Sequence, residues 1–403
     1  MTPASRAAAS ATAGKVATAQ AAAEASDAAT QHSTQAQLAG CGGASWPDRS
    51  HSGHGTPYWD ESAYWEFTSA EVDRLEAATA EIQRLALAAG DHILDHNRLA
   101  EMKIPDIAAA RIRETWNSEP PAIYGRLDLA YDGRQIKMLE YNADTPTGLV
   151  EAAVIQWYWL QECFPKEDQF NSLHEKLVAK WKDLLPYLKQ PVYFGHDGSE
   201  EDFMTINYLR DTAQQGGHDT APIAMHSVGW EDARARFVDL ERRPIESFFK
   251  LYPWEWLLSE KFGPHAMETI GPVNWMEPIW KMMWSNKALL AILWEMNPNH
   301  ELLLPAYLDG PRSLKDYAKK PLFGREGAGI TVFRNWAAEE GSPDAPDGES
   351  CVYQKLASLA ADGQNTAVIG SWLIDGEPAG IGIRESSGLV TTNTSRFVPH
   401  LFR

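Results

Sequence analysis

The chain has few of the residues and segments that mark several common classes of protein. Its 403 residues include only three cysteines, Cys41, Cys163 and Cys351, too few and too widely spaced for a disulfide framework or a paired-cysteine zinc site. We therefore expect a cytoplasmic protein. No apolar run approaches the ~20 residues that a membrane helix requires. No basic-then-apolar secretory signal is present either, so neither a membrane span nor a leader is expected.

Basic residues are also scarce. Lys and Arg number 36 against 55 Asp and Glu, which gives a formal net charge of −19 at pH 7. This balance argues against nucleic-acid or anionic membrane partners, because both require a broad basic surface. An acidic surface could attract cationic partners such as polyamines, although many cytosolic proteins are acidic for no such reason.

Composition divides the chain into two regions. Residues 1–50 are rich in Ala, Ser, Thr and Gln and have almost no large apolar side chains, so we predict a low-complexity, disordered tract. Residues 51–403 carry most of the 44% hydrophobic content. We predict that they fold as one region of two or three lobes, since a chain of this length can bury a large core.

Periodicity predicts an α/β (α+β) fold of mixed or antiparallel sheets with packed helices. Thr68 and Glu71 form a capping-box pattern, and apolar residues then recur at helical spacing over residues 72–93. Further helices are predicted over residues 107–116, 149–163, 171–188, 203–215 and 288–296. Strands are predicted over residues 191–195, 319–322, 330–333, 367–373 and 378–384.

Residues 124–151 concentrate polar groups on an apolar hairpin. The two alternating runs flank an Asp132-Gly133 turn. Polar groups on such a hairpin are costly to desolvate unless they are paired or bind a cation, so this segment is a candidate site. The polar residues are Arg126, Asp128, Glu140, Asn142, Asp144, Thr145, Thr147 and Glu151.

The hairpin carries a register condition. A two-residue Asp132-Gly133 turn would place Asp128 and Glu140 on opposite faces of the sheet. The two carboxylates can share a metal ion only if the loop has an odd length, such as five residues, or if a bulge shifts the parity.

A second candidate region runs from Lys287 to Gly329. Lys287 starts a helical segment, and Lys319-Lys320-Pro321 leads into the glycine-rich loop 324–329, which a second apolar strand follows. Such a loop would let backbone N–H groups approach phosphate oxygens while the lysines supply charge. A plain hairpin turn remains the alternative. Arg384-Glu385, near the C-terminus, is read equally as a site or as a salt-bridged strand end.

These residue types together suggest phosphoryl transfer. Mg²⁺ takes one or two carboxylates together with nucleotide phosphates, and Lys and Arg neutralise the charge that spreads over a transferring phosphoryl group. No Cys–His or Ser–His–Asp pattern indicates an acyl enzyme. A hydrolase that uses Asp128 and Glu140 as acid and base is a weaker alternative, because it leaves the lysines and the glycine loop unexplained.

From about residue 58 to residue 403 the sequence resembles the synthetase half of the glutathionylspermidine synthetase family, an ATP-grasp-like group of C–N ligases. Each matching piece is short, but together they occur in order and at similar spacing. They are Arg126-Leu127-Asp128, Glu140-Tyr141-Asn142-Ala143-Asp144-Thr145, Glu277-Pro278-Ile279-Trp280, Asn286-Lys287-Ala288, Lys320-Pro321 with its glycine loop, and Arg384.

The resemblance implies a role for each matching position. A peptide carboxylate would be phosphorylated by ATP to an acyl phosphate, and an amine would then displace phosphate. Two magnesium ions are expected, and the nucleotide-binding elements would lie mainly in residues 285–403. The implied magnesium ligands are Asp128, Glu140 and Asn142. The implied ATP-binding residues are Lys287, Lys320, Gly327, Ala328, Gly329 and Gln354. Arg126 and Arg384 would face the reacting groups, and Thr145, Thr147, Glu200 and Glu201 the peptide.

Two features depart from the best-known members of the family. Those members carry an N-terminal cysteine amidase domain, which residues 1–57 cannot supply. The loop Gly324-Arg325-Glu326-Gly327 and residues 391–400 look instead like the stand-alone homologues. We therefore expect a ligase that joins a glutathione-like peptide to a polyamine-like amine, without amidase activity. A non-catalytic ATP- or peptide-binding protein on a ligase scaffold is the competing interpretation.

Overall fold

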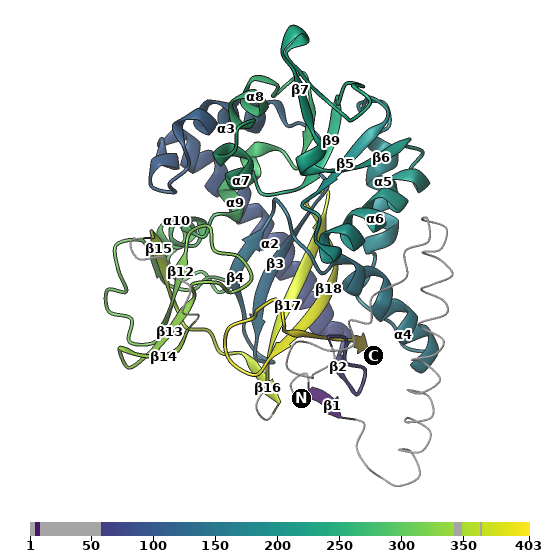
Figure 1. The fold of residues 1–403 in the computed structure, drawn as a ribbon. Coiled ribbons are helices and arrows are strands. Elements are labelled where there is room, and N and C mark those ends of the chain that lie inside the picture. Colours follow the sequence, from purple (N-terminus) through teal and green to yellow (C-terminus); the bar gives the residue numbers. More distant parts are fainter. Residues whose placement is uncertain (1–4, 9–57, 342–348, 363–364) are drawn as a thin grey trace.

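A computed structural model describes residues 5–8, 58–341, 349–362 and 365–403 (Figure 1). Most of the tract predicted to be disordered, including Cys41, lies outside the described residues. Within it, β1 (Ser5–Ala8) pairs antiparallel with β2 (Ala63–Phe67), and β20 (His400–Phe402) completes this three-stranded sheet. None of the helices among the described residues is long and apolar enough to cross a membrane.

A six-stranded antiparallel sheet forms the middle of the fold (Figure 1). Its main path runs in the order β19-β18-β17-β3-β4, and β16 pairs with β17. The predicted hairpin 124–151 therefore contributes two strands to this sheet, next to two strands from the C-terminal region. The bounds are β3 (Tyr124–Tyr131), β4 (Ile136–Asn142), β16 (Ala360–Asp362), β17 (Asn365–Ile374), β18 (Glu377–Ser386) and β19 (Arg396–Val398).

The long helix α2 (Ser69–Asp95) packs against this sheet. Both reciprocal bonds of the capping box between Thr68 and Glu71 are present, which confirms the predicted helix start. Its apolar face is buried, and a buried hydrogen bond between the hydroxyls of Thr79 and Ser371 (2.6 Å) joins the helix to β17. The predicted 3.6-residue apolar pattern thus covers one face of the sheet.

A second lobe contains a four-stranded parallel sheet in the order β10-β9-β5-β6, at the top of Figure 1. Helices α5 and α6 lie beside it, and the hairpin β7–β8 projects from the lobe. The bounds are β5 (Val192–His196), β6 (Thr220–Ala224), β7 (Gly229–Glu231), β8 (Arg236–Val238), β9 (Ser247–Leu251), β10 (Asn274–Met276), α5 (Leu173–Leu184) and α6 (Glu200–Gln215).

The third lobe is a five-stranded antiparallel sheet that contacts α10 (Ala288–Met296). Its strand order is β11-β15-β12-β13-β14, and the predicted strands on either side of the glycine-rich loop are its neighbours β12 and β13. The bounds are β11 (Ala306–Tyr307), β12 (Tyr317–Pro321), β13 (Thr331–Arg334), β14 (Ala337–Gly341) and β15 (Cys351–Lys355).

The structure confirms the predicted α/β class, with mixed sheets and packed helices. One predicted helix differs from the observed one: residues 149–163 include a π-helical segment, Glu151–Ile155, before α4 (Gln156–Cys163). Sequence periodicity does not reveal a shift from i+4 to i+5 hydrogen bonding. The other helices are α3 (Asp106–Ser118), α7 (Trp254–Ser259), α8 (Gly263–Glu268) and α9 (Met282–Ser285).

His400 is a fully buried histidine in β20. Its Nδ1 is 2.9 Å from Gln156 Oε1, whose amide nitrogen already donates to two carbonyls, so Nδ1 donates the proton. Nε2 has no hydrogen-bond partner. Burial lowers the pKa of His400 to about 3, because protonation would place an unpartnered charge in the core.

The free energy of unfolding should therefore depend on His400 at acidic pH. The unfolded histidine has a pKa of about 6.5. Below that pH the unfolded chain binds a proton at His400 and the folded chain does not, so the folded state loses stability as the pH falls. In urea denaturation, we expect wild type to lose about 1.5 kcal/mol more than His400→Gln between about pH 6.5 and about pH 5. Equal losses in the two proteins would contradict a neutral, buried imidazole.

Candidate active site

One cavity of about 420 Å³ lies where the central sheet, the parallel-sheet lobe and the third lobe meet. It collects most of the residues singled out in the sequence, from positions up to 258 residues apart. Of the predicted site residues, those on its wall are Arg126, Asp128, Glu140, Asn142, Thr145, Thr147, Glu201, Lys287, Lys320, Gly327, Gln354 and Arg384. Ala328 and Gly329 belong to the same loop as Gly327 but not to the wall. Glu200 begins α6, and its side chain lies outside the described residues.

A β-bulge brings the two central carboxylates together. The strands pair Tyr131 with Ile136, so four residues separate them in place of the two of an Asp132-Gly133 turn, and the loop length is still even. Asp132 Oδ1 closes this loop by accepting hydrogen bonds from the two backbone N–H groups just before β4 (2.9 and 2.7 Å). The register then shifts next to Asp128, which lies directly opposite Glu140. The bulge, and not the loop length, meets the register condition.

Three oxygen-bearing side chains therefore share one face of the hairpin. Asn142 Nδ2 is 3.0 Å from Glu140 Oε1 and 3.4 Å from Asp128 Oδ2. Arg126 binds Asp128 through Nε (2.6 Å) and Nη2 (3.1 Å), and its Nη1 donates to the carbonyl of Thr147 (2.6 Å). The bidentate pair holds the arginine and the aspartate in fixed relative positions at the cavity wall.

The two carboxylates have opposite pKa shifts. Burial raises the pKa of Asp128, although Arg126 acts against this rise. Burial also favours a neutral Glu140, but the ammonium groups of Lys287 and Lys320 lower its pKa to about 2. Glu140 is therefore anionic at neutral pH and cannot serve there as a proton donor.

Two lysines from different elements approach the hairpin. Lys287, at the start of α10, lies 3.2 Å from Glu140 Oε2 and donates to the carbonyl of Gly324 (2.6 Å). Lys320 in β12 donates to the carbonyl of Leu139 (3.0 Å), the extra residue of the bulge, and to Gln354 Oε1 (2.8 Å). Burial lowers the pKa of Lys320 to about 8, and the nearby Glu140 carboxylate limits this fall.

The glycine-rich loop joins β12 to β13, so it is the turn of a hairpin and also a wall of the cavity. Gly327 has φ of +75°, and a Cβ there would lie 2.5 Å from the carbonyl oxygen of Thr391. Only glycine fits this close approach. Arg325 of the loop donates to Thr145 Oγ1 (2.7 Å), a contact that the sequence patterns do not reveal.

Arg384 lies on β18, and its guanidinium carbon is 5.3 Å from the ring centroid of Phe397. One terminal nitrogen donates to the carbonyl of Thr392, and Nε has no hydrogen-bond partner. The neighbouring Glu385 accepts from Arg396 (2.6 Å) instead. Glu385 is thus salt-bridged at the strand end while Arg384 lines the cavity, because successive strand residues point to opposite faces.

The sequence patterns also missed an acidic wall. Asp197, Ser199 and Asp202 line the cavity beside Glu201. They follow the carboxyl end of β5 and open α6, the position where ligands bind in parallel sheets. Burial, followed by the charge of Asp197, raises the pKa of Asp202 to about 7. The order strand, acidic loop, helix was the available signal.

The described part of the chain contains no group of three or more Cys, His, Asp or Glu side chains placed to hold a metal ion. Asp128, Glu140 and Asn142 supply two carboxylates and an amide. This donor set fits a magnesium ion that also takes phosphate oxygens and water, since Mg²⁺ is usually held by only one or two carboxylates.

The pairing of Arg126 with Asp128 can be tested without any ligand. Removing one partner leaves a largely buried charge, 12% or 15% exposed, without its counter-ion. Arg126→Gln and Asp128→Asn should therefore each lower the free energy of unfolding by about 3 kcal/mol. The double variant should lose clearly less than the sum of the two. Additive losses in urea denaturation would contradict the ion pair.

Lysines from β12 and the start of α10, a carboxylate pair and two arginines line one cavity. These are features of an ATP-grasp-like ligase. Comparison with known families agrees. The family model described as "Glutathionylspermidine synthase preATP-grasp" matches residues 26–403, and the chain belongs to this family. The family predicted from the sequence motifs is confirmed.

Relatives include a Haemophilus influenzae protein whose name, "Putative acid--amine ligase", gives its activity provisionally. It is 38% identical over 87% of this chain and 92% of its own length. Trypanothione synthetase of Crithidia fasciculata is 28% identical over 76% of this chain and 51% of its own. The bifunctional glutathionylspermidine synthetase/amidase of Escherichia coli is 28% identical over 84% and 59%. The chain thus spans only half to three fifths of the length of these last two relatives. Among solved structures, a glutathione synthetase-like effector of Globodera pallida aligns over 82% of this chain and 87% of its own, with a TM-score of 0.48 at 10% identity.

Proposed function

We propose that this protein is a Mg-ATP-dependent ligase that joins a peptide carboxylate to an amine through an acyl phosphate. The observation that carries the proposal is the shared cavity: two lysines, two adjacent carboxylates and two arginines face one space, although they come from distant parts of the chain. The names of the relatives, an acid–amine ligase and two synthetases, support the same reaction class.

The nucleotide would bind between the third lobe and the hairpin. Lys287 and Lys320 supply positive charge for the phosphates, and Gln354 holds Lys320 in place. The loop with Gly327, Ala328 and Gly329 would cover the phosphates with backbone N–H groups. At physiological pH a nearby phosphate favours the charged form of Lys320, since an adjacent anion raises the pKa of an amine.

Asp128, Glu140 and Asn142, on the shared face of the bulged hairpin, would hold magnesium. When bound, the metal would neutralise negative charge on the phosphate oxygens. Arg126, beside Asp128, and Arg384, whose Nε has no partner, would orient the carboxylate that accepts the phosphoryl group.

The peptide and amine would occupy the side of the cavity formed by the parallel-sheet lobe. Thr145 and Thr147 offer hydroxyl groups there, and Glu201 contributes negative charge beside Asp197 and Asp202. Glu200 remains a further predicted peptide contact. By analogy with the relatives, we propose a glutathione-like peptide and a polyamine-like amine, a cation that an acidic wall would attract.

Two other functions use the same residues less completely. A binding protein without catalysis would need the lysines and the loop, but not Arg126 and Arg384 together. A hydrolase with Asp128 and Glu140 as acid and base leaves the lysines and the glycine loop unused, and the bidentate hold of Arg126 on Asp128 opposes protonation of the proposed acid.

The proposal is tested by incubating the protein with Mg-ATP and a panel of peptides and amines. We expect release of ADP that depends on both substrates, together with a product whose mass equals peptide plus amine minus water. Nucleotide binding without amine-dependent turnover across a broad panel would instead support the binding protein.

Removal of the proposed metal and carboxylate contacts should abolish turnover. Asp128→Ala and Arg384→Ala should each lower kcat/KM by roughly 100-fold or more, since Asp128 would hold the metal and Arg384 would neutralise charge in the transition state. Arg334→Ala, at an exposed position of β13, is the matched control and should retain activity. Unchanged turnover in either site variant contradicts these assignments.

The acidic wall should select a cationic substrate. Glu201→Gln should raise the KM of a polyamine by roughly tenfold, because one negative charge close to a cation is worth about 1 kcal/mol or more in this setting. The KM of a monoamine of the same length and the KM of ATP should change little. Equal effects on both amines would assign Glu201 to the peptide alone.

A further inference from the structure

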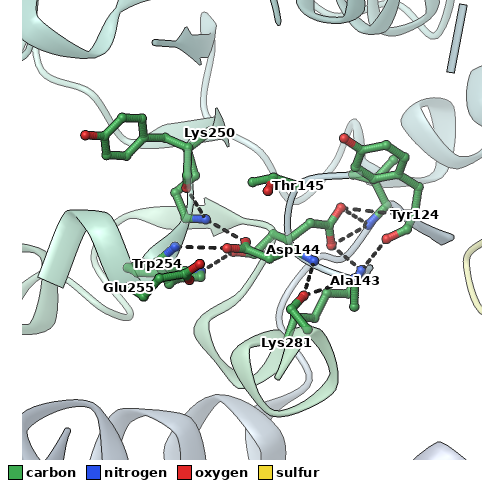
Figure 2. Close-up of polar contacts among 12 residues, drawn as sticks. Tyr124, Ala143, Asp144, Thr145, Lys250, Trp254, Glu255 and Lys281 are labelled. Carbon is green, nitrogen blue, oxygen red and sulfur yellow. Dashed lines mark hydrogen bonds and ion pairs between the residues drawn. The ribbon is translucent and has the colours of Figure 1, made fainter. Parts of the chain in front are cut away.

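Asp144 and Lys250 form a buried ion pair behind the cavity wall (Figure 2). Lys250 Nζ lies 2.7 Å from Asp144 Oδ1, and the side chains are 0% and 1% exposed. The ammonium also donates to the carbonyl of Tyr252 (2.9 Å) and lies 4.5 Å from the ring centroid of Trp254. Neither charged side chain lines the cavity.

The carboxylate of Asp144 links the segment that follows β4 to the distant segment that contains Lys250 and Trp254. Its Oδ2 accepts a hydrogen bond from the backbone N–H of Trp254 (2.9 Å), at the start of α7. The backbone N–H groups of Ala143 and Asp144 donate to Ser285 Oγ (3.0 and 2.9 Å), which adds a third segment. Figure 2 shows Lys250 and Trp254 converging on Asp144 from one side.

The residues next to these anchors are the ones that hold Arg325. Its Nη1 donates to Thr145 Oγ1 (2.7 Å), and Thr145 directly follows Asp144. Its Nε donates to Glu255 Oε1 (3.3 Å), and Glu255 directly follows Trp254. Its guanidinium carbon lies 5.8 Å from the ring centroid of Trp256, one residue further along.

We propose that the Asp144–Lys250 pair positions the glycine-rich loop over the cavity, by fixing the two segments that bind Arg325. Asp144 and Lys250 act here as positioning residues, because they reach the cavity only through Thr145, the start of α7 and Arg325. An apolar pair of similar size would keep the core filled but would lose the bond to Trp254 and the alignment of both segments.

A site-specific cleavage measurement tests this role without ligase activity. Trypsin cuts after arginine, and a guanidinium engaged by Thr145 and Glu255 is shielded from it. In the nucleotide-free protein, Asp144→Leu with Lys250→Met should speed cleavage after Arg325 by roughly tenfold, because the pair and the bond to Trp254 are both lost and local opening governs such cleavage. The fragments are identified by mass, under conditions where circular dichroism shows equal folded fractions.

The buried pair Glu277–Lys281 supplies a matched control. It is as buried as Asp144–Lys250, but its side chains bind the backbone of Ile123 and Tyr124. Glu277→Gln with Lys281→Met should therefore lower stability without changing cleavage after Arg325. Wild-type cleavage in the Asp144/Lys250 variant, or equal acceleration in both variants, would overturn the positioning role.

Asp144→Asn with Lys250→Met provides a milder variant if the first double variant does not fold, because it leaves no buried charge unpaired. Its amide oxygen can still accept from Trp254 N–H, so we expect an acceleration of only two- to threefold, roughly as for one weakened bond. No acceleration at all would count against the proposal.

The kinetic test of the pair rests on the proposed ligase function. If Asp144 and Lys250 act through Arg325, replacing both should raise the KM of ATP when Arg325 is present. The same replacements should not change the KM of ATP in the Arg325→Ala protein. Additive effects would indicate a general loss of structure. Absence of any turnover would contradict the ligase function, whereas the cleavage result would still decide the positioning role.

Discussion

The β-bulge in the β3–β4 hairpin is the constraint on which the site depends. Without the extra residue, Asp128 and Glu140 would point to opposite faces of the central sheet, and no shared site could form. With it, two carboxylates lie side by side in a partly buried position, which is unfavourable unless cations compensate them. The hairpin itself, α10 and the third lobe each supply one of those cations.

Charge compensation thereby links the lobes. Arg126 comes from the hairpin itself, Lys287 from the start of α10 and Lys320 from β12. Lys320 also donates to the carbonyl of Leu139, the extra residue of the bulge, so the third lobe contacts the hairpin at its irregular point. On the opposite side, Asp144 ties the same chain segment to the parallel-sheet lobe. The cavity lies among parts that these polar contacts hold together.

Local patterns predicted the hairpin, the capped helix α2, the strands around the glycine loop and the C-terminal strand pair. Those features depend on periodicity and turn chemistry within a short segment. The bulge was foreseen only as one of two ways to satisfy parity, because loop closure by Asp132 depends on its own hydrogen bonds. Arg325, Asp197 and Asp202 were missed as site residues, and the Lys250–Asp144 pair depends on residues 106 positions apart. A lysine inside the apolar strand 247–251 was the one local sign that a buried partner exists.

The central claim, an acyl phosphate formed in this cavity, is tested most directly by following one oxygen atom. A peptide labelled with oxygen-18 in its reacting carboxylate is incubated with the protein, Mg-ATP and amine, and the released phosphate is analysed by mass. Transfer of the phosphoryl group to the carboxylate predicts that one labelled oxygen leaves with phosphate when the amine attacks. Amide formation that releases only unlabelled phosphate would contradict the account.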